Sequence, residues 1–467
     1  MTSTTITPST GKVRRDVVGG KRGQGNDLPG RVRRPDPTKI EMRGTAEKLT
    51  SHAGLVRFGS FMRDLGVPDD LRRLFDRLKT DPRVVYPMAG QMQLLLDAHV
   101  AGESRVFGIE ALAADPVFER LSGGTVPSID TIYRDLDRFD DKAIVALESY
   151  VAKHGLDREA LRRHREHHLD IDTSVLSLTG SHEGAAIGYN PQHHRRPSLH
   201  PILARSAELD TCVGAFLRPG DAAFGNDDAP QVVRIVQRFK AALTAKQDLY
   251  VRIDGAGDCT AMMSGIADAG ARFVIKARLT KDLRDAVASA AKWRTVDRDA
   301  MNESITQVAD IAFAREEWKK RELAVRVVAV RTKEPGAGKQ VFLWPDEEWT
   351  VKVYLTNAAE PAEDVAERYE HRAGIEPLIA EWKNGWGIGD MPCWGFNANH
   401  AAMLLKLLAH NLMRRFASAV ASRLARARWR IDWIRRALIN VAGKLVRTGR
   451  RWSLLVPEAS ELVCQRE

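Results

Sequence analysis

Cysteine is scarce in this chain, and the few cysteines do not form pairs. The 467 residues include four cysteines, Cys212, Cys259, Cys393 and Cys464, and no Cys-x-x-Cys motif. This spacing excludes a disulfide framework and a structural zinc site of the usual kind, and it predicts a cytosolic, reduced protein. No matching cysteines accompany the histidines, so we interpret them as basic surface or as contacts to a DNA backbone; they are His164, His167, His168, His193 and His194.

Long apolar runs are also absent. A membrane-spanning helix needs roughly 18–20 apolar residues. The segment Ala401–Leu412 comes closest, but Lys406, His410 and Asn411 interrupt it. The N-terminal residues lack the charge and apolar core of a signal peptide. We therefore expect a protein without a membrane partner.

Positive charge is concentrated at the two ends of the chain, whose formal net charge is +10. Residues 1–50 hold 11 Lys or Arg against 5 Asp or Glu, and residues 414–467 hold 13 against 4, which leaves an acidic middle. Basic ends around an acidic middle favour a polyanion-binding protein whose centre binds metal. Basic tails that merely aid solubility are the alternative interpretation.

From residue 166 onward, strands and helices alternate in a characteristic order. Strands are predicted at 169–178, 199–204 and 212–217, then a helix from Pro230, a strand at 249–254, a helix at 261–269 and a strand at 272–277. Three hairpin-connected strands followed by helix, strand, helix and strand is the order of a ribonuclease-H-like core. The predicted fold class is therefore α/β, with a ribonuclease-H-like catalytic core.

The hydrophobic pattern divides the chain into six segments. We predict a basic flexible arm at 1–45, a helical DNA-binding domain at 46–165, core segments at 166–278 and 349–416, a β-rich insertion at 279–348 that interrupts the core, and a basic helical segment at 417–467. In the insertion we expect a helix at 281–293 and strands at 306–314, 323–330 and 340–344. A strand at 351–355, a helix at 362–382 and an apolar core helix at 401–416 follow.

One helix of the N-terminal domain is a candidate for reading DNA. Ser128 is predicted to cap a helix whose apolar stripe includes Ile132 and Leu136. Its other face carries Asp130 and Arg134, so it could be the second helix of a helix-turn-helix. Ordinary helical packing is the alternative.

Three acids fall at the ends of the predicted core elements. Asp172 lies in the first strand, Asp254 closes the fourth, and Glu376 lies on the helix at 362–382. In a ribonuclease-H-like sheet the first and fourth strands are neighbours, so all three carboxylates can meet. Their repulsion requires divalent cations, and hard oxygen ligands favour two Mg²⁺ ions, with Mn²⁺ as a substitute. Asp170 competes with Asp172, because residues i and i+2 of a strand face the same side.

The motif around Glu376 reads Tyr369, Arg372, Glu376 and Lys383, at spacing Tyr-(2)-Arg-(3)-Glu-(6)-Lys. On one continuous helix all four side chains would point the same way. Arg372 could hold a phosphate bidentately, Lys383 could supply a point charge, and Tyr369 could bond to a phosphate. An ordinary Arg372–Glu376 ion pair on a helix surface is the alternative.

This pattern resembles the DDE transposases of bacterial insertion sequences, in the branch marked by the same Tyr, Arg, Glu and Lys spacing. The resemblance covers roughly residues 50 to 450. It implies that Asp172, Asp254 and Glu376 bind two Mg²⁺ ions, while Tyr369, Arg372 and Lys383 contact DNA phosphates near the cleaved end. It also implies a cut-and-paste route through a DNA hairpin.

The function expected from these features is that of a transposase. It would bind the terminal inverted repeats of its own element, cleave the DNA by two-metal hydrolysis, and join the 3′ ends to target DNA by transesterification. The expected partners are double-stranded DNA and a second protomer, in a paired-end complex associated with the nucleoid. The alternatives are a ribonuclease-H-like DNA nuclease and a non-catalytic, domesticated DNA-binding protein.

Overall fold

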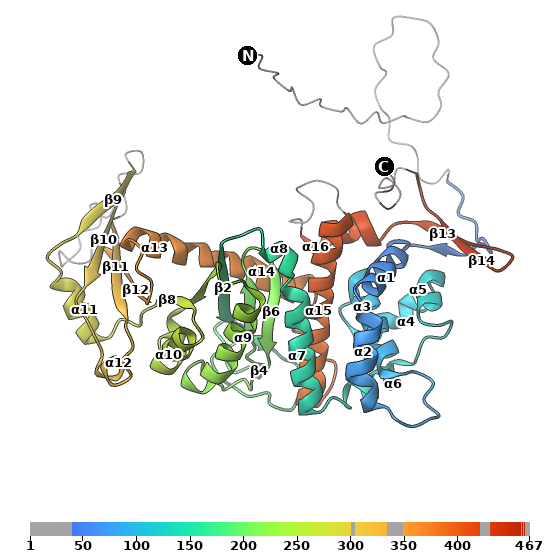
Figure 1. Ribbon diagram of the computed structural model, residues 1–467. Helices are drawn as coiled ribbons and strands as arrows, with labels where there is room; N and C mark the ends of the chain where they lie inside the picture. The colour runs from blue at the N-terminus through green and yellow to red at the C-terminus, as the bar shows by residue number, and fades with distance from the viewer. Residues whose placement is uncertain are drawn as a thin grey trace, which may run out of the picture. The chain divides into compact units, whose positions relative to one another are not determined.

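A computed structural model describes residues 40–299, 304–333, 349–420 and 430–458, together with residues 460 and 462. The chain divides into two units, residues 1–46 and residues 47–467. Within the described part of the first unit, Arg43 forms an ion pair with Glu41. Most of the predicted arm at 1–45 lies outside the described residues. The following paragraphs concern the second unit (Figure 1).

A nine-stranded mixed sheet organises this unit. Its strands are β2 (Glu166–Thr173), β5 (Ile202–Ser206), β6 (Thr211–Phe216), β7 (Asp248–Ile253), β8 (Arg272–Lys276), β9 (Arg294–Asp299), β10 (Ser304–Ile311), β11 (Arg326–Lys333) and β12 (Thr350–Thr356). Their order across the sheet is β6-β5-β2-β7-β8-β12-β11-β10-β9. The pairs β2–β7 and β7–β8 are parallel, and the others are antiparallel.

The predicted neighbourhood of the first and fourth core strands is confirmed. β2 and β7 pair in parallel, with Ile171 opposite Ile253. Alternate side chains of the sheet enter two different cores, as the two-residue period of a strand requires. Ile202 packs on the side of helices α9 (Ala229–Ala242) and α10 (Thr260–Asp268), whereas Leu203 packs on the side of α15 (Phe396–Val420). The central parallel strands are therefore covered on both faces.

The predicted insertion extends the same sheet. β12 pairs with β8 on one side and with β11 on the other, so β9, β10 and β11 continue the core strands outward. Helices α11 (Lys281–Ala288) and α12 (Glu316–Lys320) belong to this region. The predicted strands at 306–314 and 323–330 correspond to β10 and β11. β9 was not predicted, and the candidate strand at 340–344 lies outside the described residues.

Most of residues 54–161 lie in helices. They are α1 (Gly54–Asp64), α2 (Val67–Phe75), α3 (Met88–Ala101), α4 (Ile109–Leu112), α5 (Pro116–Leu121), α6 (Ile129–Leu136), α7 (Asp141–Gly155) and α8 (Arg158–Leu161). The predicted cap of α6 is confirmed, because Ser128 Oγ accepts from the backbone N–H of Thr131. Ile132 and Leu136 are buried, so one face of α6 packs inside the protein. Whether the opposite face reads DNA stays a prediction.

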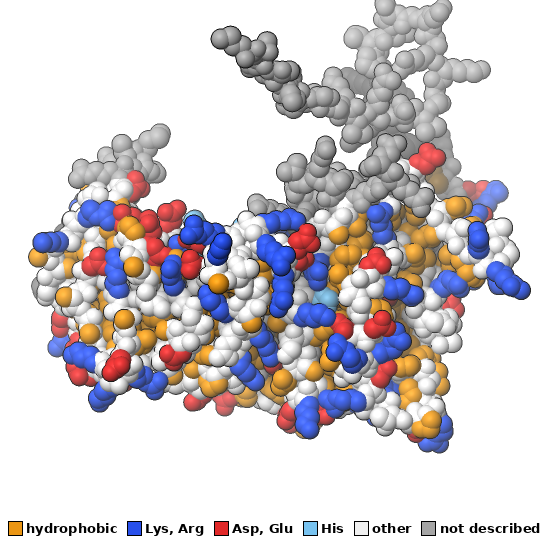
Figure 2. All heavy atoms as spheres, viewed as in Figure 1, with side chains coloured by type: hydrophobic (Ala, Val, Ile, Leu, Met, Phe, Trp, Pro, Cys, Tyr) orange, Lys and Arg blue, Asp and Glu red, His pale blue; other side chains and the backbone are white. Residues whose placement is uncertain are grey.

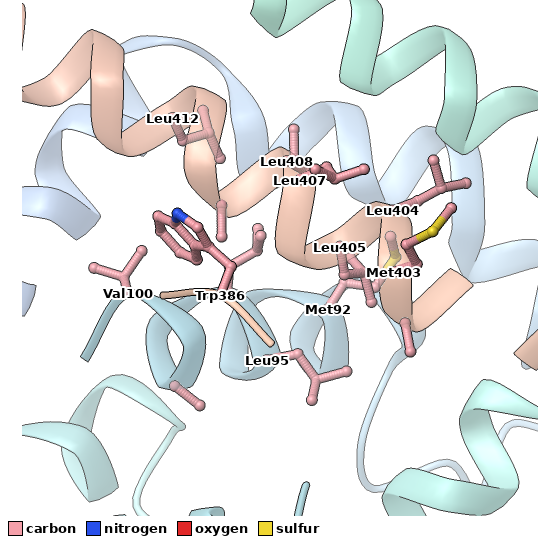
Figure 3. Close-up of a cluster of buried hydrophobic side chains, with 14 of the residues drawn as sticks. Met92, Leu95, Val100, Trp386, Met403, Leu404, Leu405, Leu407, Leu408 and Leu412 are labelled. Carbon is pink, nitrogen blue, oxygen red and sulfur yellow. The ribbon is translucent and has the colours of Figure 1, made fainter. Parts of the chain in front are cut away.

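The apolar core helix predicted at 401–416 lies within α15, between α7 on one side and α1 to α3 on the other (Figure 1). Figure 3 shows Met92 of α3 beside Leu405 of α15, and Val100 of α3 beside Trp386. All of residues 398–414 in α15 are buried. In the described parts of the chain no helix has both the length and the apolarity to cross a membrane.

The C-terminal tail corrects one prediction. Instead of helix throughout 417–467, the chain forms α16 (Ile431–Ile434), a short π-helical turn, and a hairpin of β13 (Gly443–Thr448) and β14 (Arg451–Leu455). β13 also pairs with β1 (Leu49–Thr50). Gly449 adopts a positive φ of 62° in the tight turn, a conformation that glycine adopts without strain and that ends a strand rather than continuing a helix. The helix predicted across residues 421–429 lies outside the described residues.

A buried amide joins α15 to the edge of the sheet. Asn411 is fully buried, and its Oδ1 accepts from Cys212 N at 2.8 Å. Its Nδ2 donates to Cys212 O at 2.7 Å and to Val151 O at 3.0 Å. One side chain therefore satisfies the open edge of β6 and the end of α7 together.

We expect Asn411→Ala to lower the free energy of unfolding by about 2–4 kcal/mol, because buried backbone groups of Cys212 and Val151 lose their hydrogen-bond partner. Urea denaturation of the purified protein measures this change. Gln237→Ala removes an exposed amide from α9 and should change stability by less than about 0.5 kcal/mol. Equal effects of the two substitutions would contradict the role of Asn411.

Candidate active site

Two of the predicted acids lie at the carboxyl ends of neighbouring parallel strands. Asp172 and Asp254 follow the register pair Ile171–Ile253, one residue further along β2 and β7. Burial raises the pKa of Asp172, and the nearby charge of Asp254 raises it further, although Arg372 opposes both effects. The structure therefore brings these two carboxylates within electrostatic reach of each other.

In each of these carboxylates, one oxygen accepts a hydrogen bond from the backbone. Asp172 Oδ1 accepts from Thr173 N at 2.9 Å, and Asp254 Oδ1 accepts from Ala256 N at 3.0 Å. The described residues provide no hydrogen bond to Oδ2 of either side chain. Free oxygens on two adjacent carboxylates are hard donors of the kind that Mg²⁺ and Mn²⁺ prefer, so this donor set fits a divalent cation.

Arg372 reaches the sheet from the helical motif. Its Nη2 donates to Ile171 O at 3.0 Å and lies 3.1 Å from Asp172 Oδ1. Only 7% of the residue is exposed. Its ion-pair partner is thus Asp172, and the alternative of a surface pair with Glu376 is not observed among the described residues.

The motif does not form one continuous helix, which corrects the prediction for 362–382. It consists of α13 (Ala362–Glu370), a 3₁₀ turn at His371–Gly374, and α14 (Ile375–Asn384). The backbone at Gly374 approaches the sheet so closely that a Cβ there would lie 2.5 Å from Arg205 Nη1. The turn lets Arg372 bend inward, and the regular 3.6-residue spacing is lost at that point.

Tyr369 and Lys383 lie near the same end of the sheet. Burial raises the pKa of Tyr369 to about 12, with the charges of Asp254 and Asp172 acting in the same direction. Lys383 Nζ donates to Val175 O at 3.0 Å. Burial lowers the pKa of Lys383, and Asp172 opposes that shift. Three of the four motif residues therefore lie in the electrostatic field of Asp172.

Glu376 stands apart from this group. It is exposed in the first turn of α14, where a carboxylate also interacts favourably with the helix dipole. Across residues 40–299, 304–333, 349–420 and 430–458, no three His, Cys, Asp or Glu side chains form a group that could hold a metal ion. The place of Glu376 beside the two aspartates stays a prediction.

Asp170, the competing first acid, has a different environment. Its side chain is completely buried. Arg252 donates to both of its oxygens, at 2.6 and 3.0 Å, and Arg205 lies 3.3 Å from Oδ2. The sequence carried a signal for this cluster, because Arg252 interrupts an otherwise apolar buried strand, and a buried charge requires a partner.

Comparisons with known proteins agree with the pattern of the sequence. The family model described as "Transposase DDE domain group 1" matches residues 33–463. No curated protein matches the chain. Among solved structures, a piggyBac transposase synaptic complex with hairpin DNA is 10% identical, with 82% of this chain and 78% of that chain covered and a TM-score of 0.40. A score of this size is too low to carry an argument about this chain.

Asp170 and Asp172 should differ in what their substitution costs. We expect Asp170→Asn to lower the free energy of unfolding by about 3–5 kcal/mol, because the buried Arg252 loses its counter-charge and Arg205 keeps only its pair with Asp210. Asp172→Asn should cost less, about 1–2 kcal/mol, because it takes the ion-pair partner from the buried Arg372 but also removes the repulsion from Asp254. Chemical denaturation of both variants measures the difference, and a larger loss for Asp172→Asn would contradict this division of roles.

Proposed function

Because the chain belongs to the DDE transposases of domain group 1 and is a DDE-type DNA transposase, we propose that it cuts the terminal inverted repeats of its own element and joins the 3′ ends to target DNA. The observation that carries this proposal is the pair of half-engaged carboxylates, Asp172 and Asp254, on neighbouring strand ends. The order β6-β5-β2-β7-β8 supports a ribonuclease-H-like core around them.

The proposed metal ligands are Asp172, Asp254 and Glu376. DDE transposases use divalent metal ions, and we propose two Mg²⁺ ions, for which Mn²⁺ could substitute. Bound there, the ions would activate the attacking oxygen and stabilise the leaving oxygen of a phosphodiester. Asp172 and Asp254 would offer their free Oδ2 atoms. Glu376 would complete the set from the first turn of α14.

The remaining motif residues are proposed to hold the DNA. Lys383 and Tyr369 both feel the charge of Asp172 and are proposed to contact a phosphate bound beside it, and Arg372 could donate to the same phosphate. The helical region at 46–165 and the basic segment at 417–467 are proposed as DNA-binding regions. Because two element ends must be joined, we propose a homodimer in a paired-end complex, in a bacterial cell and associated with the nucleoid.

The full-length protein should cleave and join DNA in the presence of Mg²⁺. The test incubates it with a labelled duplex that carries the element's presumed end, together with a second, unlabelled duplex, and resolves the products on a denaturing gel. Cleavage at the end with joining to the second duplex is the expected result. Nicking without joining would instead indicate a nuclease, and binding without any cut a non-catalytic DNA-binding protein.

Substitution of the proposed metal ligands should separate binding from chemistry. We expect Asp254→Ala and Glu376→Ala each to abolish detectable cleavage and joining, because metal-assisted chemistry is lost, while DNA affinity measured by gel shift stays within about twofold. Glu367→Ala, which removes an exposed acid from α13, is the matched control and should cleave normally. Retained cleavage in either ligand variant would refute the assignment of that residue.

A further inference from the structure

A basic hollow lies at the end of the sheet opposite the candidate active site. It is lined by residues 162–165, which precede β2, and by residues 244–248, which lead into β7. Asp172 lies near the other end of β2, and Asp254 follows the other end of β7. At about 3.3 Å per residue, a strand of this length places the two ends roughly 25 Å apart.

Four cations line this hollow without counter-charges of their own. Arg162, Arg163, Arg165 and Lys246 are all exposed. In the part of the chain that the structure describes, their side chains form no ion pair and no hydrogen bond. The free positive charge is therefore available to a ligand.

Two acids next to the basic segments, Asp248 and Glu166, pair with other cations, although Asp248 also lines the hollow. Asp248 pairs with Arg272, and Glu166 lies 3.0 Å from Arg368. Among the described residues, neither these two acids nor Glu159, one helical turn before Arg163, forms an ion pair with any of the four cations. Figure 2 shows Lys and Arg side chains gathering on the face around α8, the short helix that leads into residues 162–165.

A buried glutamine fixes the two basic segments relative to each other. Gln247 Nε2 donates to Leu161 O and to His164 O, both at 2.8 Å. Its Oε1 accepts from Thr244 N at 2.9 Å, and the next residue, Asp248, donates its N–H to Arg165 O at 3.0 Å. The cations thus project from a preorganised frame, which reduces the entropy that binding would cost.

The four cations repel one another because they are held close together. A ligand that carries many negative charges relieves this repulsion when it binds. The hollow is open and holds about 740 Å³, which suits a passing backbone better than an enclosed small molecule. Duplex DNA carries a negative charge for about every 1.7 Å of its axis. Four unpaired cations on a rigid frame match such a backbone.

We propose that this surface binds the phosphate backbone of the duplex whose end is cleaved, several base pairs away from the cleaved bond. The proposal rests on the proposed function, because it takes that duplex as the substrate. At about 3.4 Å per base pair, a separation of roughly 25 Å corresponds to about seven or eight base pairs. The contact is therefore expected to depend on the length of the duplex.

The test replaces three cations together, as Arg162→Gln, Arg163→Gln and Lys246→Gln, in the full-length protein. With a duplex of about 30 base pairs we expect at least a tenfold loss of affinity near 0.1 M salt, and a decrease of about 2–3 in the slope of log K against log salt. With a stem-loop of about six base pairs, too short to reach the hollow, the variant and the unchanged protein should bind alike.

A charge-matched control separates local contact from a change in net charge. Lys319→Gln, Lys320→Gln and Arg321→Gln remove three exposed cations in and beside α12, and should leave the length-dependent affinity unchanged. An unchanged salt slope in the first variant would overturn the proposal. So would an equal loss on the short stem-loop, or a greater loss with single-stranded RNA of matched length.

The outcome for the proposed function is separate. The unchanged protein is assayed for cleavage and joining in parallel, and failure there would refute the transposase mechanism whatever the salt slopes show. If the unchanged protein cleaves and joins normally but the two variants have identical slopes of log K against log salt, the proposed function stands. Only the proposal of a second DNA contact surface is then refuted.

Discussion

The arrangement of the candidate site depends on one buried ion cluster. Asp170 is enclosed in the sheet between Arg252 of β7 and Arg205 of β5, so a single carboxylate joins three strands. Arg252 also donates to the backbone of Arg368 in α13 at 2.7 Å, and Arg205 lies against Gly374. The cluster thereby seats the helical motif on the sheet, and it directs Arg372 toward Asp172.

Asp170 and Asp172 differ in how fully neighbouring arginines neutralise their charges, and this difference separates a structural carboxylate from a candidate metal ligand. Both oxygens of Asp170 face guanidinium groups, so its charge is satisfied within the fold and has little left to offer a ligand. Two residues later, Asp172 shares one guanidinium and repels Asp254. A bound cation would relieve that repulsion. The excess of negative charge lies where the strands β2 and β7 end. The basic hollow at the opposite end has the reverse imbalance.

Much of the core could be predicted from the sequence, because its signals are local. Alternation in the strands and a buried strand ending at Asp254 gave the correct neighbours β2 and β7. What failed depends on contacts between distant residues. The helical period around Arg372 could not reveal the 3₁₀ turn at His371–Gly374, where Gly374 lies against Arg205 of a distant strand. β9 has only Val296 as an apolar residue, so its pairing with β10 had no local signature. Basic composition suggested helix where a turn at Gly449 makes a hairpin.

The burial of α15 has a consequence for how the protein comes apart. Residues 398–414 of α15 are buried on every side, so the loss of either neighbouring group of elements would expose a continuous apolar stripe of the helix to water. Phe416 contacts Phe58 and Phe61 of α1, while Asn411 bonds to β6 on another side. Melting of the N-terminal helices and of the sheet is thereby coupled in a single cooperative transition. A fragment trimmed to the strands and their acids would present the bare side of α15 to solvent and self-associate.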